Sequence, residues 1–146
     1  MWEIINTNDE ILKFMEKVNC FHDSCIKEIS YVSGAYVDEN LSMYPLNNRR
    51  ILRVAIQRQS EKDSMIELEF QGLKYLKLFP EDENYTCEIS DSTMITKDGN
   101  IYWCDCGNLS EADSDDYTGT LICASTLKWR SVEKNKNKKE FYHSDV

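Results

Sequence analysis

The pattern of apolar and polar positions changes once along the chain, near Asn19. Between residues 8 and 18, apolar side chains recur every three to four positions, which is the spacing of one face of an α-helix. This face consists of Ile11, Leu12, Met15 and Val18, with Phe14 beside them. Thr7 or Asn8 can cap the first turn. The pattern therefore predicts a single amphipathic helix near the start of the chain.

After Asn19, short alternating runs separated by polar turns replace the helical spacing. The clearest pair is 51–58 and 66–70, joined by the polar turn 60–63. Apolar positions alternate there with Arg53, Glu67 and Glu69, so we expect a hairpin with one buried face and one face in water. The apolar positions are Leu52, Val54, Ile56, Ile66, Leu68 and Phe70.

Further strands are expected at 25–32 and 35–37 on either side of the turn signal Ser33-Gly34, and at 73–79 between Gly72 and Pro80. Strands at 86–96 and 100–105 flank Asp98-Gly99, a strong hairpin signal, and the last strand is expected at 120–130. This spacing predicts an α+β fold, in which the helix packs on a mainly antiparallel sheet or sandwich of about seven to eight strands.

With 146 residues, the chain has the length of one ordinary domain. We expect a single α+β domain over 1–132 and a polar, mobile tail over 133–146, with docking of Phe141 and Tyr142 as the alternative. The sequence has no apolar run long enough to cross a membrane and no secretory signal, so we expect a soluble, cytoplasmic protein with reduced cysteines.

Negative charge is concentrated in one region. Residues 78–118 contain eleven acids and one base, in a chain whose net charge is −9. Such a protein repels phosphates and gains no counterion release, so nucleic-acid binding is not expected. The acidic loops either keep the protein in solution or hold a basic protein partner, such as a basic toxin domain, by electrostatic complementarity.

Aromatic residues beside the acidic loop 107–119 give this second interpretation a possible contact patch. The predicted partner-binding residues are Tyr102, Trp103, Asp105, Glu111, Asp113, Asp115 and Asp116. The alternating acids of this loop lack the glycine and terminal glutamate of an EF-hand, so calcium is not predicted. An exposed edge of the sheet would also permit a homodimer.

The densest group of reactive side chains is NCFHDSCI, residues 19–26. One alternative is a zinc site, with candidate ligands Cys20, His22, Cys25, Cys104 and Cys106. Another is a small hydrolase that uses His22, an orienting Asp23 or Asp105, and a nucleophilic Cys20 or Cys25. No oxyanion hole or glycine-rich phosphate loop is evident, so we predict no catalytic residue and no cofactor. The structural interpretation is a helix-to-strand junction in which Phe21 folds back on the helix.

Four short runs carry a resemblance: Phe21-His22-Asp23-Ser24-Cys25-Ile26-Lys27-Glu28-Ile29, Arg49-Arg50-Ile51-Leu52-Arg53-Val54, Ile66-Glu67-Leu68-Glu69-Phe70 and Ile101-Tyr102-Trp103. In these runs, the sequence is similar to a group of small bacterial α+β proteins with an FHDSCI-type first strand. In size and acidity it also resembles the immunity proteins of bacterial toxin systems. The resemblance implies a fold of this class and, by analogy, a protein that binds and blocks a toxin.

Overall fold

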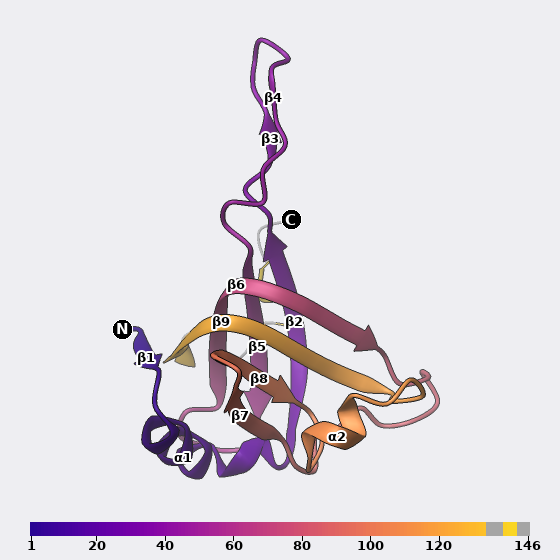
Figure 1. Cartoon of the computed structure of the whole chain (residues 1–146). Helices are drawn as coiled ribbons and strands as arrows, with labels where there is room; N and C mark the ends of the chain where they lie inside the picture. Colours follow the sequence, from indigo (N-terminus) through magenta and orange to yellow (C-terminus); the bar gives the residue numbers. More distant parts are fainter. Residues whose placement is uncertain (134–138, 143–146) are drawn as a thin grey trace.

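The body of the protein is one curved antiparallel β-sheet, shown in the computed structural model of Figure 1. The structure describes residues 1–133 and 139–142. Within these ranges the sheet has the strand order β2-β5-β6-β9-β8-β7, and β1 pairs with β9. The strands are β1 (Glu3–Ile5), β2 (Ser24–Val32), β5 (Ile51–Arg58), β6 (Met65–Phe79), β7 (Thr93–Lys97), β8 (Asn100–Cys104) and β9 (Gly119–Ser131). The predicted, mainly antiparallel sheet is therefore confirmed.

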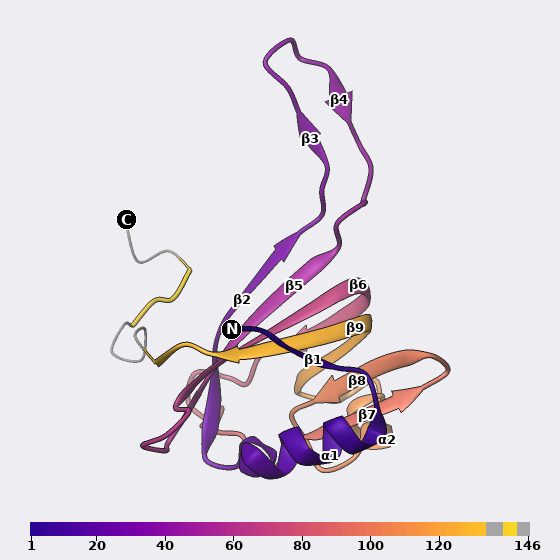
Figure 2. The same cartoon turned by 90° about the vertical axis from the view of Figure 1, so that its left-hand side faces the viewer.

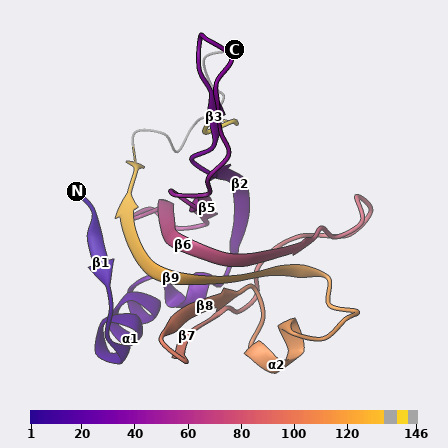
Figure 3. The same ribbon diagram turned by 45° about the horizontal axis from the view of Figure 1, so that its top comes forward.

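Two predicted hairpins are confirmed by their registers. β5 and β6 pair with Val54 opposite Leu68, which places the alternating apolar side chains of both strands on one buried face. β7 and β8 pair across the Asp98-Gly99 turn. β6 does not break at Gly72 as predicted. Instead Gly72, with a positive φ of 63°, bends the strand, and β6 runs on beside β9 around the body (Figure 3).

The core lies between the sheet and helix α1 (Asn8–Lys17). Thr7 caps this helix by accepting a hydrogen bond from the backbone N–H of Glu10. Ile11, Phe14 and Met15 are buried, whereas Leu12 is exposed and does not belong to the buried face. A short 3-10 turn, η1 (Asn19–Phe21), follows, and its Phe21 ring packs edge-on against Trp103.

The predicted turn at Ser33-Gly34 is wrong. The chain passes straight through these residues into a long hairpin, in which β3 (Tyr36–Val37) pairs with β4 (Met43–Tyr44). The turn lies further on, where the Asp38 carboxylate accepts hydrogen bonds from the backbone N–H groups of Asn40 and Ser42. A Cβ on Gly34 would lie 2.0 Å from the Asn48 side chain, so this glycine allows the two sides of the hairpin to approach each other.

Two other segments differ from the expectation. Residues 86–92 do not form the first half of a strand, and the segment contributes only a single bridge between Ile89 and Ser24 before β7 begins. The loop 107–119 contains a short helix, α2 (Leu109–Ala112), whose first turn is capped by the Asn108 side chain. Both segments lie at the same end of the sheet, far from the β3–β4 hairpin (Figures 1 and 2).

Part of the expected tail docks on the sheet. Phe141 is buried against Ala55, Met65 and Val132, and the Tyr142 hydroxyl donates a hydrogen bond to Glu67. Phe141 and Tyr142 therefore lie on the sheet, where a mobile tail was expected. Their aromatic side chains cover apolar and charged groups of the sheet. The remainder of that prediction, over 134–138 and 143–146, lies outside the described residues. Among the described helices, none has the length and apolar character needed to cross a membrane.

Candidate functional site

The two acidic segments, 80–91 and 105–118, border one cleft of about 540 Å³. The cleft opens between the edge strand β2 and the far ends of β6 and β9. Its lining includes apolar side chains, among them Ile26, Ile29 and Leu78. The charged residues along it are one base and four acids: Lys27, Glu28, Glu81, Glu88 and Asp105. The fold therefore brings acidic residues from separate parts of the sequence to one place.

The two predicted contact residues of β8, Tyr102 and Trp103, lie on opposite faces of the sheet. Trp103 is fully buried in the core, so its side chain does not lie on the surface and we remove it from the proposed contact surface. Tyr102 points to the opposite face, as strand alternation requires, and packs edge-on against Tyr75.

Asp105 has a structural task in the cleft. Its carboxylate accepts hydrogen bonds from the Tyr117 hydroxyl and from the backbone N–H of Thr120. Burial, followed by the hydrogen bond to Asp105, raises the pKa of Tyr117 well above its ordinary value. Asp105 therefore fixes the loop that carries the other acids and is itself only half-exposed.

The remaining predicted contact residues, Glu111, Asp113, Asp115 and Asp116, are all exposed. Asp113 forms an ion pair with Lys77 at 3.2 Å, and Asp116 accepts a hydrogen bond from the Ser114 hydroxyl. Glu81 and Glu88, which the sequence reasoning left out of the contact set, are exposed beside the cleft. In the sequence, only the excess of acidic residues over 78–118 pointed to Glu81 and Glu88.

His22 lies beside the first acidic segment. Its Nδ1 is 2.7 Å from the carbonyl oxygen of Ser90, and its Nε2 is 3.5 Å from the Asp23 carboxylate. The hydrogen bond to Ser90, then the negative charges of Asp23, Glu88 and Asp91, raise the pKa of His22. The imidazole is thus oriented by the backbone and acidic neighbours, and neither nitrogen is bonded to a cysteine.

The five candidate zinc ligands do not come together. The Sγ atoms of Cys104 and Cys106 lie 3.7 Å apart, but Cys25 faces Cys87 and Cys20 lies near Asp91. Among residues 1–133 and 139–142, no group of three or more His, Cys, Asp or Glu side chains is arranged to hold a metal ion. This geometry does not support the zinc alternative.

The cysteines also lack the environment of a nucleophile. Burial raises the pKa of the Cys20 and Cys25 thiols, and neighbouring Asp91 and Cys87 raise them further. Burial likewise raises the pKa of Cys104 to about 12. A catalytic cysteine needs the opposite shift, toward the thiolate, so this geometry does not favour the hydrolase alternative.

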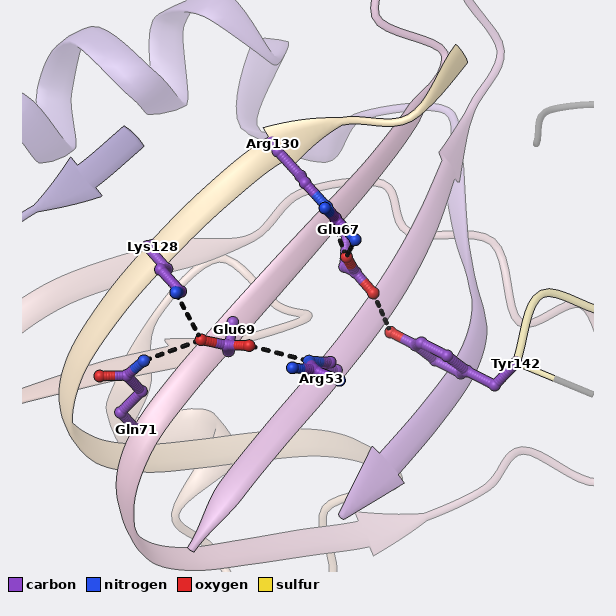
Figure 4. Close-up of polar contacts among 7 residues, drawn as sticks. All are labelled: Arg53, Glu67, Glu69, Gln71, Lys128, Arg130 and Tyr142. Atoms are coloured by element: carbon purple, nitrogen blue, oxygen red, sulfur yellow. Dashed lines mark hydrogen bonds and ion pairs between the residues drawn. The ribbon is translucent and has the colours of Figure 1, made fainter. Parts of the chain in front are cut away.

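The most connected polar cluster lies elsewhere, on the outer face of β5, β6 and β9 (Figure 4). We call it the sheet-face ion network. Glu69 accepts from Arg53 at 2.8 Å, from Gln71 at 2.8 Å and from Lys128 at 3.0 Å. Glu67 pairs with Arg130 at 2.7 Å and accepts from the Tyr142 hydroxyl at 2.9 Å.

The prediction that the polar face of the β5–β6 hairpin lies in water is therefore wrong at the centre of that face. Glu67 and Glu69 are each only 2% exposed. Trp2 covers the network on one side, stacking on Lys128 and Arg130, and Tyr142 covers it on another. Burial opposes ionisation of Glu69, but the bonds from Arg53, Gln71 and Lys128 outweigh it and lower the pKa. A carboxylate held in this way is a poor proton acceptor, so the network serves stability.

Comparison of the chain with protein-family models, with curated proteins and with solved structures finds no match.

Proposed function

We propose that this protein is a non-enzymatic protein-interaction module that binds a basic protein partner through its two acidic segments. One observation carries the proposal: the exposed carboxylates of Glu81 and Glu88 lie along a partly apolar cleft that Asp105, from the second acidic segment, also borders. Charged groups at the rim of a contact surface steer an oppositely charged partner, while apolar groups at its centre supply affinity. Asp105 fixes the second segment through its bonds to Tyr117 and Thr120. The exposed acids Glu111, Asp113, Asp115 and Asp116 extend the surface.

The kind of partner follows from this charge. We propose a cationic protein, such as the basic nuclease domain of a toxin, and an immunity role in the cytoplasm of a bacterium. The acidity and the resemblance to immunity proteins support this assignment. The zinc and hydrolase alternatives draw no comparable support from the positions of the cysteines.

The test is binding of the purified protein to a panel of basic toxin domains over a range of salt concentrations. We expect at least one domain to bind with an affinity that falls steeply as salt rises, because rim charges act through a screened field. Absent binding across the panel, or binding that does not respond to salt, would contradict the proposal.

A variant that neutralises charges of the two acidic segments distinguishes steering by these segments from an effect of the total negative charge. The variant Glu81→Gln, Glu88→Gln, Asp115→Asn should lower the association rate by about tenfold at low salt. Its matched control is Glu3→Gln, Asp9→Asn, Glu16→Gln, which removes three charges from the exposed side near helix α1. Equal losses in the two variants would show that total charge, rather than the acidic segments, governs binding.

A further inference from the structure

A long hairpin projects from the body between β2 and β5, and we call residues 33–50 the arm (Figures 1 and 2). Its base is fixed, because the Ser33 carbonyl accepts hydrogen bonds from the backbone N–H groups of Arg49 and Arg50. Beyond that base, β3 and β4 pair only with each other. The sheet therefore covers neither side of the arm.

The arm exposes apolar side chains on both of its faces. Adjacent residues of a strand point in opposite directions, so the cross-strand pairs Tyr36–Tyr44 and Val37–Met43 occupy opposite faces. The two tyrosine rings stack at 4.8 Å, and Met43 remains 67% exposed. Leu41 near the tip and Leu46 nearer the base are 84% and 64% exposed. A concentration of apolar surface on so slender an element is typical of a contact surface.

Charge is arranged along the arm in a definite order. Asp38 and Glu39 lie at the tip, and Arg49 and Arg50 lie at the base, so the arm has no net charge in a chain of −9. Within the part of the chain that the structure describes, none of Glu39, Arg49 and Arg50 forms an ion pair. The arm is thus a region of this acidic chain whose own net charge does not repel a second copy.

From this arrangement we infer that the arm binds the arm of a second copy of this chain. Two arms side by side in opposite directions place the acidic tip of each next to the basic base of the other. This contact between tip and base then forms twice about a two-fold axis, as a symmetric dimer requires. Leu41 of one copy meets Leu46 of the other, and the tyrosine pairs lie at the centre. A basic partner would gain nothing from a neutral arm, and it is drawn instead to the acidic segments.

The chain exposes more surface than a compact monomer of its mass, which leaves enough area for such a dimer. A compact monomer of 17.1 kDa is expected to expose about 7,800 Å², whereas this chain exposes 9265 Å². The arm contributes to the excess of about 1,500 Å² because nearly all its side chains are exposed. A standard dimer interface buries about 1,600 Å² in total, or about 800 Å² on each copy, so the excess on one chain is larger than the area that such a dimer needs from it.

Sedimentation of the wild-type protein, from about 1 to about 500 µM, tests the inference. We expect a monomer–dimer equilibrium within this range. The variant Tyr36→Ser, Tyr44→Ser should weaken it by more than about tenfold, because it removes the central apolar contact. A wild-type protein that stays monomeric at the highest concentration would overturn the inference.

Charge-reversal variants test whether each arm binds the arm of a second copy. Glu39→Lys alone and Arg49→Glu alone should each weaken the dimer by about two- to tenfold. An equimolar mixture of the two variants should recover association, because each tip then faces a base of opposite charge. Glu83→Lys, which changes the net charge as Glu39→Lys does but lies away from the arm, should leave the dimer intact. No recovery in the mixture, or equal weakening by Glu83→Lys, would also overturn the inference.

Discussion

Glu67 and Glu69 show how two charged residues become part of the interior of this protein. Each is nearly inaccessible to water, and each has a basic partner on β9, while Glu69 has a second on β5. A buried charge costs several kcal/mol unless it is paired and hydrogen-bonded, and every carboxylate here meets both conditions. Removing one member leaves the opposite charges without compensation.

Glu69→Gln should therefore lower the free energy of unfolding by about 3 kcal/mol at neutral pH, because Arg53 and Lys128 would face a neutral amide. Urea denaturation measures the change. The control is Glu16→Gln on the exposed side of helix α1, which should change the free energy by less than about 0.5 kcal/mol. A similar, small effect of both variants would contradict a stabilising role for the network.

The pH dependence of the same variant has a defined sign. The pKa of Glu69 lies below its ordinary value near 4.5, so its ionised form stabilises the folded state. This contribution is present above that ordinary value and is lost as the pH falls through the lower, folded pKa. The difference between wild type and Glu69→Gln should shrink over that acidic window, and a difference that stays constant there would contradict the assignment.

At the scale of elements, the C-terminal segment 139–142 belongs to the folded body. Phe141 fills an apolar site beside Met65, and Tyr142 closes the sheet-face ion network. Phe141→Ala should lower the free energy of unfolding by about 2 kcal/mol, because it leaves a cavity beside Ala55 and Met65. Tyr85→Ala, a substitution of an exposed aromatic residue, should change it by less than about 0.5 kcal/mol. Equal effects in thermal or urea unfolding would show that the segment does not contribute.

The elements that local patterns predicted correctly are those whose signals act over a few residues. Alternation in β5 and β6 and the Asp98-Gly99 turn specify hairpins directly. Gly34 misled the prediction because a glycine permits a tight turn and a close approach equally well, and only the position of Asn48 decides between them. The register of β9 against β6 places Lys128 opposite Glu69, and no local pattern contains that information.

The candidate site was also predictable only where the signal lies within a short stretch of the sequence. The charge count identified the acidic region, and most of its acids are exposed. The burial of Trp103 follows from alternation along β8, since Ile101 and Trp103 share the core face and Tyr102 the other. The cleft itself required the strand order, because β2 and residues 118–120 border it only after the sheet has curved.

At the scale of the whole molecule, the two proposed contact surfaces lie on different parts of the protein. The acidic segments lie at one end of the sheet and the neutral arm projects from another side (Figures 1 and 2). Two copies joined through their arms would therefore keep their acidic clefts apart and open. The proposed binding of a basic partner and the inferred dimer can occur together, and each can fail without the other.

The central claim is that the acidic segments are the contact surface for a basic protein. Its most direct test is a map of backbone amide NMR shifts in this protein as the tightest-binding basic domain is added. We predict that the shifted amides gather in residues 80–91 and 105–118 and in the facing part of β2, and that arm amides stay unchanged. Shifts confined to the arm or to the sheet-face ion network, with the acidic segments unaffected, would contradict the account.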